Sequence, residues 1–261
     1  KSLLEIGSGW YPTFPLACYL AGAARVTTVD LNRHQKPELL MACAERLQRV
    51  VPLIAQASGT DENVVQARHA RMLTRLRDCA DLADATDGVV DYLAPADASR
   101  TGFTPNQIDG IFSNSVLEHV PETAISAIYR EAQRVLVPGG IMFHSVNCGD
   151  HYAYVDRSIH QLHYLRYSDA QWAFWNNAFL HQNRLRAHVF VELAEHLGFE
   201  IVLNTAHATP LRLEQLAALP VHARFAEIEP ARLCITSVDF IARKPVTASA
   251  PAAPDVVRSA V

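Results

Sequence analysis

An acidic residue, a glycine turn and a second acid form the most informative pattern in the chain. Residues 3–9 read Leu-Leu-Glu-Ile-Gly-Ser-Gly, and residues 26–30 read Val-Thr-Thr-Val-Asp. Glycine allows a sharp turn and a close approach of the backbone to a ligand. Asp30 ends the second apolar run, where a carboxylate can accept hydrogen bonds from both hydroxyls of a ribose. The pattern predicts a nucleoside pocket.

The spacing of the glycines indicates which nucleoside ligand this is. A dinucleotide fingerprint G-x-G-x-x-G would place its third glycine at Pro12. Proline also lacks the N–H that could hold a pyrophosphate. The sequence contains no G-x-x-x-x-G-K-S/T phosphate loop either. A ligand with a ribose and an amino-acid tail, without phosphates, therefore fits the turn better.

Apolar runs that alternate with helical patterns must position these residues. We expect strands at Ser2–Ile6, Arg25–Val29, Val89–Leu93, Ile108–Ser113, Ile141–Val146, Phe199–Asn204 and Leu233–Ala242. We expect helices at Thr13–Gly22, Glu122–Leu136, Arg184–Leu197 and Leu211–Leu219, with Pro138-Gly139-Gly140 between the second of these and the next strand. This order predicts an α/β fold, a doubly wound and mostly parallel seven-stranded sheet with helices on both faces and an antiparallel last strand.

The expected domain covers residues 1–245 and includes two additions. Residues 37–84 read as a helical insertion, and the aromatic, polar segment 147–183 reads as a lid over a substrate. Residues 246–261 are rich in Ala, Pro and Ser and are expected to form a disordered tail. The chain opens inside its first strand, so we also expect a covering segment upstream of residue 1.

Charge and cysteine content narrow the possible partners. A net charge of -4 argues against a nucleic acid as the main partner, because its phosphates bind to a basic face of a protein. No apolar run is long enough to span a membrane, and no secretory signal is present. The five cysteines are scattered, without C-x-x-C spacing, which is typical of reduced thiols and a cytoplasmic location.

With the acidic residue and G-x-G turn, two downstream motifs resemble those of class I S-adenosylmethionine-dependent methyltransferases. These are Ser-Val-Leu-Glu-His-Val at 115–120 and Arg-Val-Leu-Val-Pro-Gly-Gly at 134–140. The resemblance covers about residues 3–146, and it departs from the family's G-x-G-x-G at Tyr11. The region from Asp150 to Arg186 is similar to a poorly characterised subset of these enzymes that carries a His- and Trp-rich insertion after the fifth strand.

This resemblance implies S-adenosyl-L-methionine as cofactor and a Rossmann-like fold. The implied cofactor-binding residues are Glu5, Gly7, Ser8, Gly9, Asp30, Leu31, Asp97, Ala98 and Asn114. By the same resemblance, Glu5 would orient the amino group of the methionine part, and Asp30 would hold the ribose. Asp97 would meet the adenine, and Asn114 would meet the methionine end.

The acceptor is expected to be a small molecule that is methylated on oxygen or nitrogen. Methylation of a hydroxyl benefits from a general base, and histidine suits neutral pH. His151 is the first candidate base, His119 the second, and Asp156 a partner that would orient the base. His160-x-x-His163 lies near these residues as a possible metal pair, but we expect no metal because methyl transfer needs none.

Two other classes of function remain open from the sequence. An NAD-dependent oxidoreductase would use a similar sheet, although Pro12 argues against its pyrophosphate. A non-catalytic module could keep the pocket for structural or regulatory purposes. Competition between the two cofactors, and a search for methyl release, would separate these classes.

Overall fold

The computed structural model describes residues 1–78, 81–177 and 181–246, and its chain divides into two compact units. The first unit comprises residues 1–112 and 134–137. The second unit comprises residues 113–133 and the described residues from 138 onward. The expected tail at 246–261 lies outside the described residues, apart from Val246.

Seven strands form one sheet in the order β3-β2-β1-β4-β5-β7-β6, which confirms the expected fold class. They are β1 (Ser2–Ile6), β2 (Arg25–Val29), β3 (Val90–Leu93), β4 (Ile108–Asn114), β5 (Leu136–Asn147), β6 (Glu200–Asn204) and β7 (Ser237–Arg243). Strands β1, β2 and β3 pair in parallel, as do β1 and β4, whereas β7 runs antiparallel to β5 and β6. The last strand therefore lies between the fifth and the sixth and is antiparallel, as expected.

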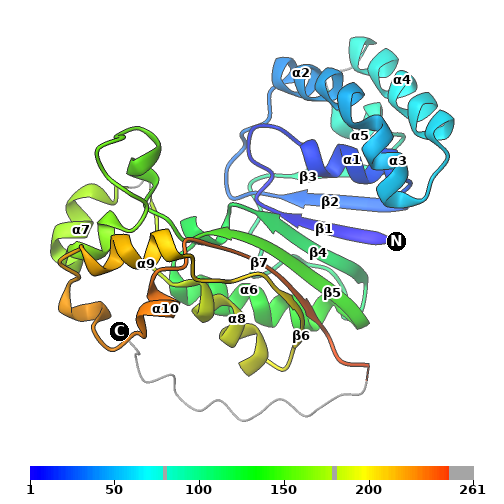
Figure 1. Ribbon diagram of the computed structural model, residues 1–261. Helices are drawn as coiled ribbons and strands as arrows, with labels where there is room; N and C mark the ends of the chain where they lie inside the picture. Colours follow the sequence, from blue (N-terminus) through cyan, green and yellow to red (C-terminus); the bar gives the residue numbers. More distant parts are fainter. Residues whose placement is uncertain (79–80, 178–180, 247–261) are drawn as a thin grey trace. The chain divides into compact units, whose positions relative to one another are not determined.

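In the first unit, helices gather around β1, β2 and β3 (Figure 1). They are α1 (Thr13–Ala21), α2 (Pro37–Leu47), η1 (Gln48–Val50), α3 (Val51–Ser58), α4 (Glu62–Asp78) and α5 (Leu82–Ala85). Gly22 ends α1 in a left-handed conformation, which glycine adopts without strain. Leu16 and Leu20 of α1 pack with Val65 and Met72 of α4 in one buried core. The segment expected to be a helical insertion is thus built into the core of this unit.

In the second unit, α6 (Glu122–Val135) and α8 (Ala187–His196) pack against the sheet. The ring of Tyr129 stacks on that of His144 from β5 at a centroid distance of 5.5 Å, and α8 contacts β6 and β7. Beyond the end of β5 lie η3 (His151–Tyr154), η4 (His163–Arg166), α7 (Asp169–Trp175), α9 (Pro210–Ala217), η5 (Ala223–Phe225) and α10 (Pro230–Leu233) (Figure 1). Tyr164 and Trp172 share a buried core there with Leu216 and Phe225.

Three expected boundaries are wrong for physical reasons. The strand β5 begins at Leu136 and includes the Pro-Gly-Gly run, because Gly139 N–H donates to the carbonyl of Lys244 at 2.8 Å. Helix α8 begins at Ala187 because the backbone of Arg186 is extended, and the guanidinium of Arg186 donates to buried carbonyls such as that of Cys148. Leu233, the expected start of the last strand, instead ends α10, and β7 begins at Ser237.

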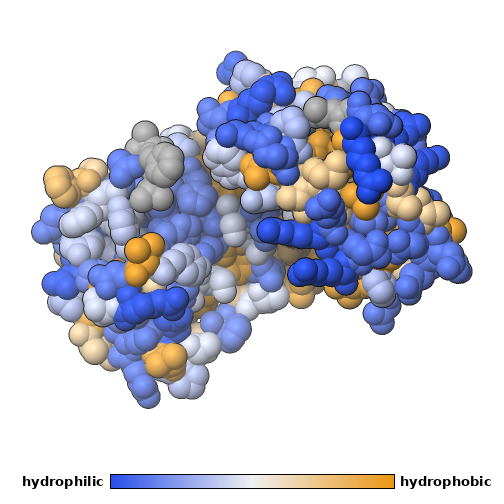
Figure 2. Space-filling model, turned by 90° about the horizontal axis from the view of Figure 1, so that it is seen from above, coloured by the Kyte–Doolittle hydropathy of each residue, from blue (hydrophilic) through white to orange (hydrophobic). Residues whose placement is uncertain are grey.

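The face of the protein that Figure 2 shows is mainly polar. On the face shown in Figure 2, hydrophilic residues predominate over both units, and hydrophobic residues form small separate patches. None of the helices in the described ranges combines the length and apolar composition that crossing a membrane requires.

Candidate functional site

The glycine turn after β1 is bonded to the end of β2 within the first unit. Gly7 N–H and Ser8 N–H donate to the carbonyl of Val29 at 2.8 and 3.3 Å. Gly7 and Gly9 have φ of 81° and 59°, a region that disfavours side chains. A Cβ at Gly9 would meet no atom within 4 Å, so the backbone conformation rather than crowding requires glycine there.

Glu5 is buried at the end of β1, next to this turn. The hydroxyl of Thr28 donates to its carboxylate, and the hydroxyl of Ser8 lies 2.5 Å from that of Thr28. The pKa of Glu5 is raised to about 8, mainly because the carboxyl is buried; the Thr28 hydrogen bond lowers this pKa and the charge of Asp30 raises it. Glu5 is therefore mostly protonated at neutral pH until a cation approaches it.

Asp30 connects the turn to the loop after β2. Its Oδ2 accepts from Gly9 N–H at 3.1 Å, and its Oδ1 accepts from Asn32 N–H at 3.0 Å. Leu31, the next residue, is 67% exposed and offers an apolar face. The carbonyl of Asp30 accepts from Ala96 N–H at 2.8 Å. This last bond joins Asp30 to the loop that carries Asp97 and Ala98.

Asp97 is exposed, and its Oδ1 accepts from Ser99 N–H at 2.8 Å. Hydrogen bonds from Ser99 hold the pKa of Asp97 below its ordinary value. Ala98 is half-buried beside it. The structure thus connects the predicted residues of β1, β2 and the loop after β3 within one unit. Tyr11, at the position of the family's third glycine, is 46% exposed.

Asn114 belongs to the second unit, where it ends β4 with an exposed side chain. Ser115 follows with φ of 53°, an uncommon conformation for a residue other than glycine. The chain then forms the 3-10 helix η2 (Leu117–His119). The motif that resembles the methyltransferases is therefore a strand end followed by a sharp turn.

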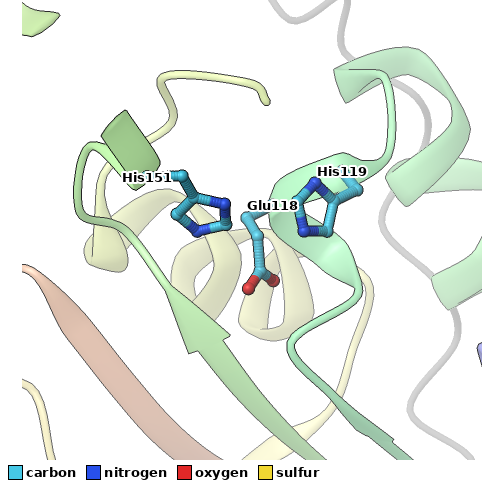
Figure 3. Close-up of side chains that lie close together, drawn as sticks. All are labelled: Glu118, His119 and His151. Atoms are coloured by element: carbon cyan, nitrogen blue, oxygen red, sulfur yellow. The ribbon is translucent and has the colours of Figure 1, made fainter. Parts of the chain in front are cut away.

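Glu118, His119 and His151 come together in the second unit (Figure 3). One ligand-type atom from each residue lies within 4.8 Å of the other two. The two imidazole rings meet edge to face at a centroid distance of 5.1 Å. His119 Nδ1 donates to the carbonyl of His181 at 2.7 Å, since a carbonyl can only accept. Neutral His119 therefore carries its lone pair on Nε2.

Burial sets the charges in this cluster. Glu118 is 1% exposed; its Oε1 accepts from Asn147 N–H at 3.3 Å, while its Oε2 has no partner among the described residues. Burial raises the pKa of Glu118 to about 7. Burial and then the charge of His119 lower the pKa of His151 to about 4. The Nε2 atom of His151 is likewise buried without a partner in the described part of the chain.

A short segment after α7 holds the cluster in place. The side chain of Asn183 donates to the carbonyls of Leu117 and Val120 at 2.7 and 2.8 Å. Gln182 is buried and accepts from His151 N–H at 3.3 Å. His119 and His151 were among the residues expected from the sequence, whereas Glu118 was not, although the Glu-His pair of the 115–120 motif was the available signal.

Asp156 does not orient His151 in the way the sequence suggests. Its carboxylate is exposed and accepts from the N–H and hydroxyl of Ser158 at 2.9 and 2.6 Å. Glu118 is instead the carboxylate beside His151. His163 Nδ1 lies 3.8 Å from Asp150 Oδ2, and neither His160 nor His163 belongs to the cluster found among the described residues.

An open cavity of about 270 Å³ adjoins the cluster through two residues. Its lining is Ser115, Ser145, Val146, Asn147, Tyr154, Gln161, Thr236 and Ser237. Asn147 Nδ2 donates to the Tyr154 hydroxyl at 2.6 Å, and the Tyr154 ring lies 5.7 Å from that of His151. Hydroxyls and amides, without a charged side chain, thus surround the space next to Glu118 and His151.

Comparisons with solved structures return methyltransferases of low identity. A geranyl diphosphate C-methyltransferase from Streptomyces coelicolor A3(2), in complex with Mg²⁺, geranyl diphosphate and S-adenosyl-L-homocysteine, is 14% identical, with a TM-score of 0.48 over 93% of this chain and 71% of that one. A methyltransferase from Mesorhizobium loti is 13% identical (TM-score 0.48, 93% and 90% covered). One from Listeria monocytogenes, described as putative in its own name, is also 13% identical (0.49, 94% and 91%).

The family comparison is more decisive. No curated protein matches the chain, but a family model described as a methyltransferase domain matches residues 1–204. The chain therefore belongs to the methyltransferase domain family, which confirms the expected class I S-adenosylmethionine-dependent enzyme.

Proposed function

We propose that the enzyme transfers a methyl group to an oxygen or nitrogen atom of a small, polar acceptor. The observation that supports this most is the cluster of Glu118, His119 and His151, which gathers proton-accepting groups beside the cavity of hydroxyls and amides. The cavity lining is uncharged, and this favours a neutral, hydroxyl- or amine-bearing molecule.

The first unit has the groups that S-adenosylmethionine would need. When bound, this cofactor supplies a methyl group on a positively charged sulfur. In our assignment Glu5, with its buried carboxyl, ionises to pair with the amino group, and Asp30 accepts from the ribose hydroxyls. Gly7, Ser8 and Gly9 wrap the methionine part, and Leu31 and Asp97 with Ala98 contact the adenine.

His151 is our first candidate for the general base and His119 the second. His151 Nε2 is buried and without a partner in the described residues, and His119 Nε2 is the lone-pair nitrogen of that ring because Nδ1 donates to His181. Proton removal by a positioned base accelerates a reaction by roughly 10²- to 10⁴-fold. Glu118, rather than the expected Asp156, is the carboxylate near His151.

Turnover with labelled S-adenosylmethionine and a panel of small alcohols and amines tests this proposal. His151→Ala should lower turnover by at least about tenfold while the affinity for S-adenosylhomocysteine, measured by calorimetry, stays unchanged. His196→Ala, on an exposed position of α8, is the matched control. Undiminished turnover in His151→Ala would show that another group removes the proton.

The cytoplasmic location and the lack of a nucleic-acid partner stay predictions. The first is supported by Cys18, Cys43, Cys148 and Cys234, which are free thiols in the structure. The second is supported by the net charge of -4.

A further inference from the structure

We propose that Glu118, His119 and His151 hold a divalent transition-metal ion with the preferences of Zn²⁺. This site lies entirely within the second unit. The role that we give the ion rests on the proposed function and deepens it, because coordination of the acceptor would replace proton removal by His151.

The donor atoms are already gathered. They lie within 4.8 Å of one another, and Figure 3 shows Glu118 between the two imidazole rings. Ligands about 2.1 Å from one Zn²⁺ stand roughly 3.4 Å apart in a tetrahedral site. Side-chain movements on the order of 1 Å therefore close the site, and His119 is exposed enough to make them.

Two buried atoms of the cluster lack a partner, and this points to a ligand. Glu118 Oε2 and His151 Nε2 are both buried without a hydrogen bond in the described part of the chain. Such atoms cost free energy unless something satisfies them. A cation between them would satisfy both, and it would favour the ionised carboxylate and the neutral imidazole over their protonated forms.

The surroundings are arranged as they are around bound metals. A ligand imidazole usually donates its other N–H to a carbonyl or carboxylate, which fixes the ring. His119 does this through Nδ1 to the carbonyl of His181. Glu118 Oε1 is held by Asn147 N–H, and His151 N–H by Gln182. The ligands are thus oriented by the backbone around them.

The composition of the donor set selects the metal. Two imidazole nitrogens and one carboxylate oxygen suit Zn²⁺ and its neighbours, whereas Mg²⁺ and Ca²⁺ prefer sets of oxygen ligands. Three protein ligands leave a fourth position open, as in catalytic zinc sites. The cavity is next to the cluster through Asn147, which contacts Glu118, and Tyr154, which contacts His151.

An acceptor hydroxyl in that fourth position would be activated. A bound divalent ion lowers the pKa of a coordinated oxygen toward neutrality. The O–H bond then breaks, its electron pair stays on oxygen, and the proton passes to water. This leaves a nucleophilic oxygen without a protein base.

Metal titration of tag-free, chelator-treated protein tests the inference. The wild type should bind one Zn²⁺ in competition with a chromophoric chelator, and Co²⁺ should give visible d–d bands. Glu118→Gln and His119→Gln should each weaken Zn²⁺ binding at least tenfold and abolish the d–d bands of Co²⁺. The circular dichroism spectrum should stay unchanged. His160→Gln, a half-buried histidine outside the cluster, is the control and should bind like the wild type.

Each result decides one proposal. Equal Zn²⁺ affinity in the wild type and in Glu118→Gln overturns the inference, as does loss of Zn²⁺ in His160→Gln. Calorimetry with S-adenosylhomocysteine is run on the same samples. Absent heat there overturns the proposed function and leaves a positive Zn²⁺ result standing, whereas normal heat without Zn²⁺ binding overturns only the metal site.

Discussion

The N–H of Gly9 donates to Oδ2 of Asp30 at 3.1 Å. One oxygen of the acid that is assigned to the ribose therefore also holds the glycine turn. Because each carboxylate oxygen has two lone pairs, this bond leaves capacity for the ribose hydroxyls. Affinity for the cofactor and the conformation of the turn should depend on the same side chain.

Replacing Asp30 tests this dependence. Asp30→Ala should weaken the binding of S-adenosylhomocysteine by more than about tenfold, because hydrogen bonds to a charged acceptor contribute about 1.5–3 kcal/mol each. Calorimetry measures the affinity, and thermal unfolding checks the fold. Asp91→Ala, which removes a half-buried carboxylate of β3 that pairs with Arg25 of β2, should bind as the wild type does. An unchanged affinity in Asp30→Ala would remove Asp30 from the site.

The raised pKa of Glu5 predicts release of a proton when the cofactor binds. In the free protein Glu5 is mostly protonated below its pKa of about 8, and pairing with a cationic amino group favours the ionised form. Binding at pH 7 should thus release nearly one proton, and affinity should rise between pH 6 and 8. Calorimetry in buffers of different ionisation enthalpy measures the release. Glu5→Gln should abolish it, and equal release in both proteins would assign the proton to another group.

His144 makes the second unit sensitive to acid. Burial lowers its pKa to about 3, so the folded state keeps it neutral while the unfolded state takes up a proton near the ordinary pKa of 6.5. The stability that it contributes is complete above that value and is lost as the pH falls below it. Urea midpoints at pH 7.5 and 5.5 should differ less in His144→Gln than in the wild type. The exposed His196→Gln should retain the full difference.

Asn183 should stabilise the turn that carries Glu118. Asn183→Ala removes its two bonds to the carbonyls of Leu117 and Val120. The free energy of unfolding should fall by about 1–3 kcal/mol, the cost of carbonyls left unsatisfied, and turnover should fall with it. Urea unfolding measures the first effect. Asn204→Ala, at an exposed position, loses one local hydrogen bond to Ala206, so its free energy of unfolding should fall less. Equal falls in the two variants would mean that the bonds of Asn183 to Leu117 and Val120 do not stabilise the turn.

Local patterns were sufficient to predict the sheet and the turn on which the candidate cofactor residues lie. Short apolar runs predict strands, and apolar residues that recur every three to four positions predict helices, because burying one face of each element is favourable. Glu5, Gly9 and Asp30 could be identified from the sequence since each ends a strand or forms the turn next to it. The parallel pairing of β1 with β2 then brings these ends together.

Only the tertiary structure decided the cluster of the second unit. Glu118, His119 and His151 meet because the segment at 181–183 bonds to both η2 and η3, through pairs that are 62 and 31 positions apart in the chain. No periodicity within one element encodes such contacts. The sequence therefore determined a cofactor-binding sheet by local burial and turn chemistry, whereas long-range hydrogen bonding chose Glu118 over Asp156 as the carboxylate of the candidate site.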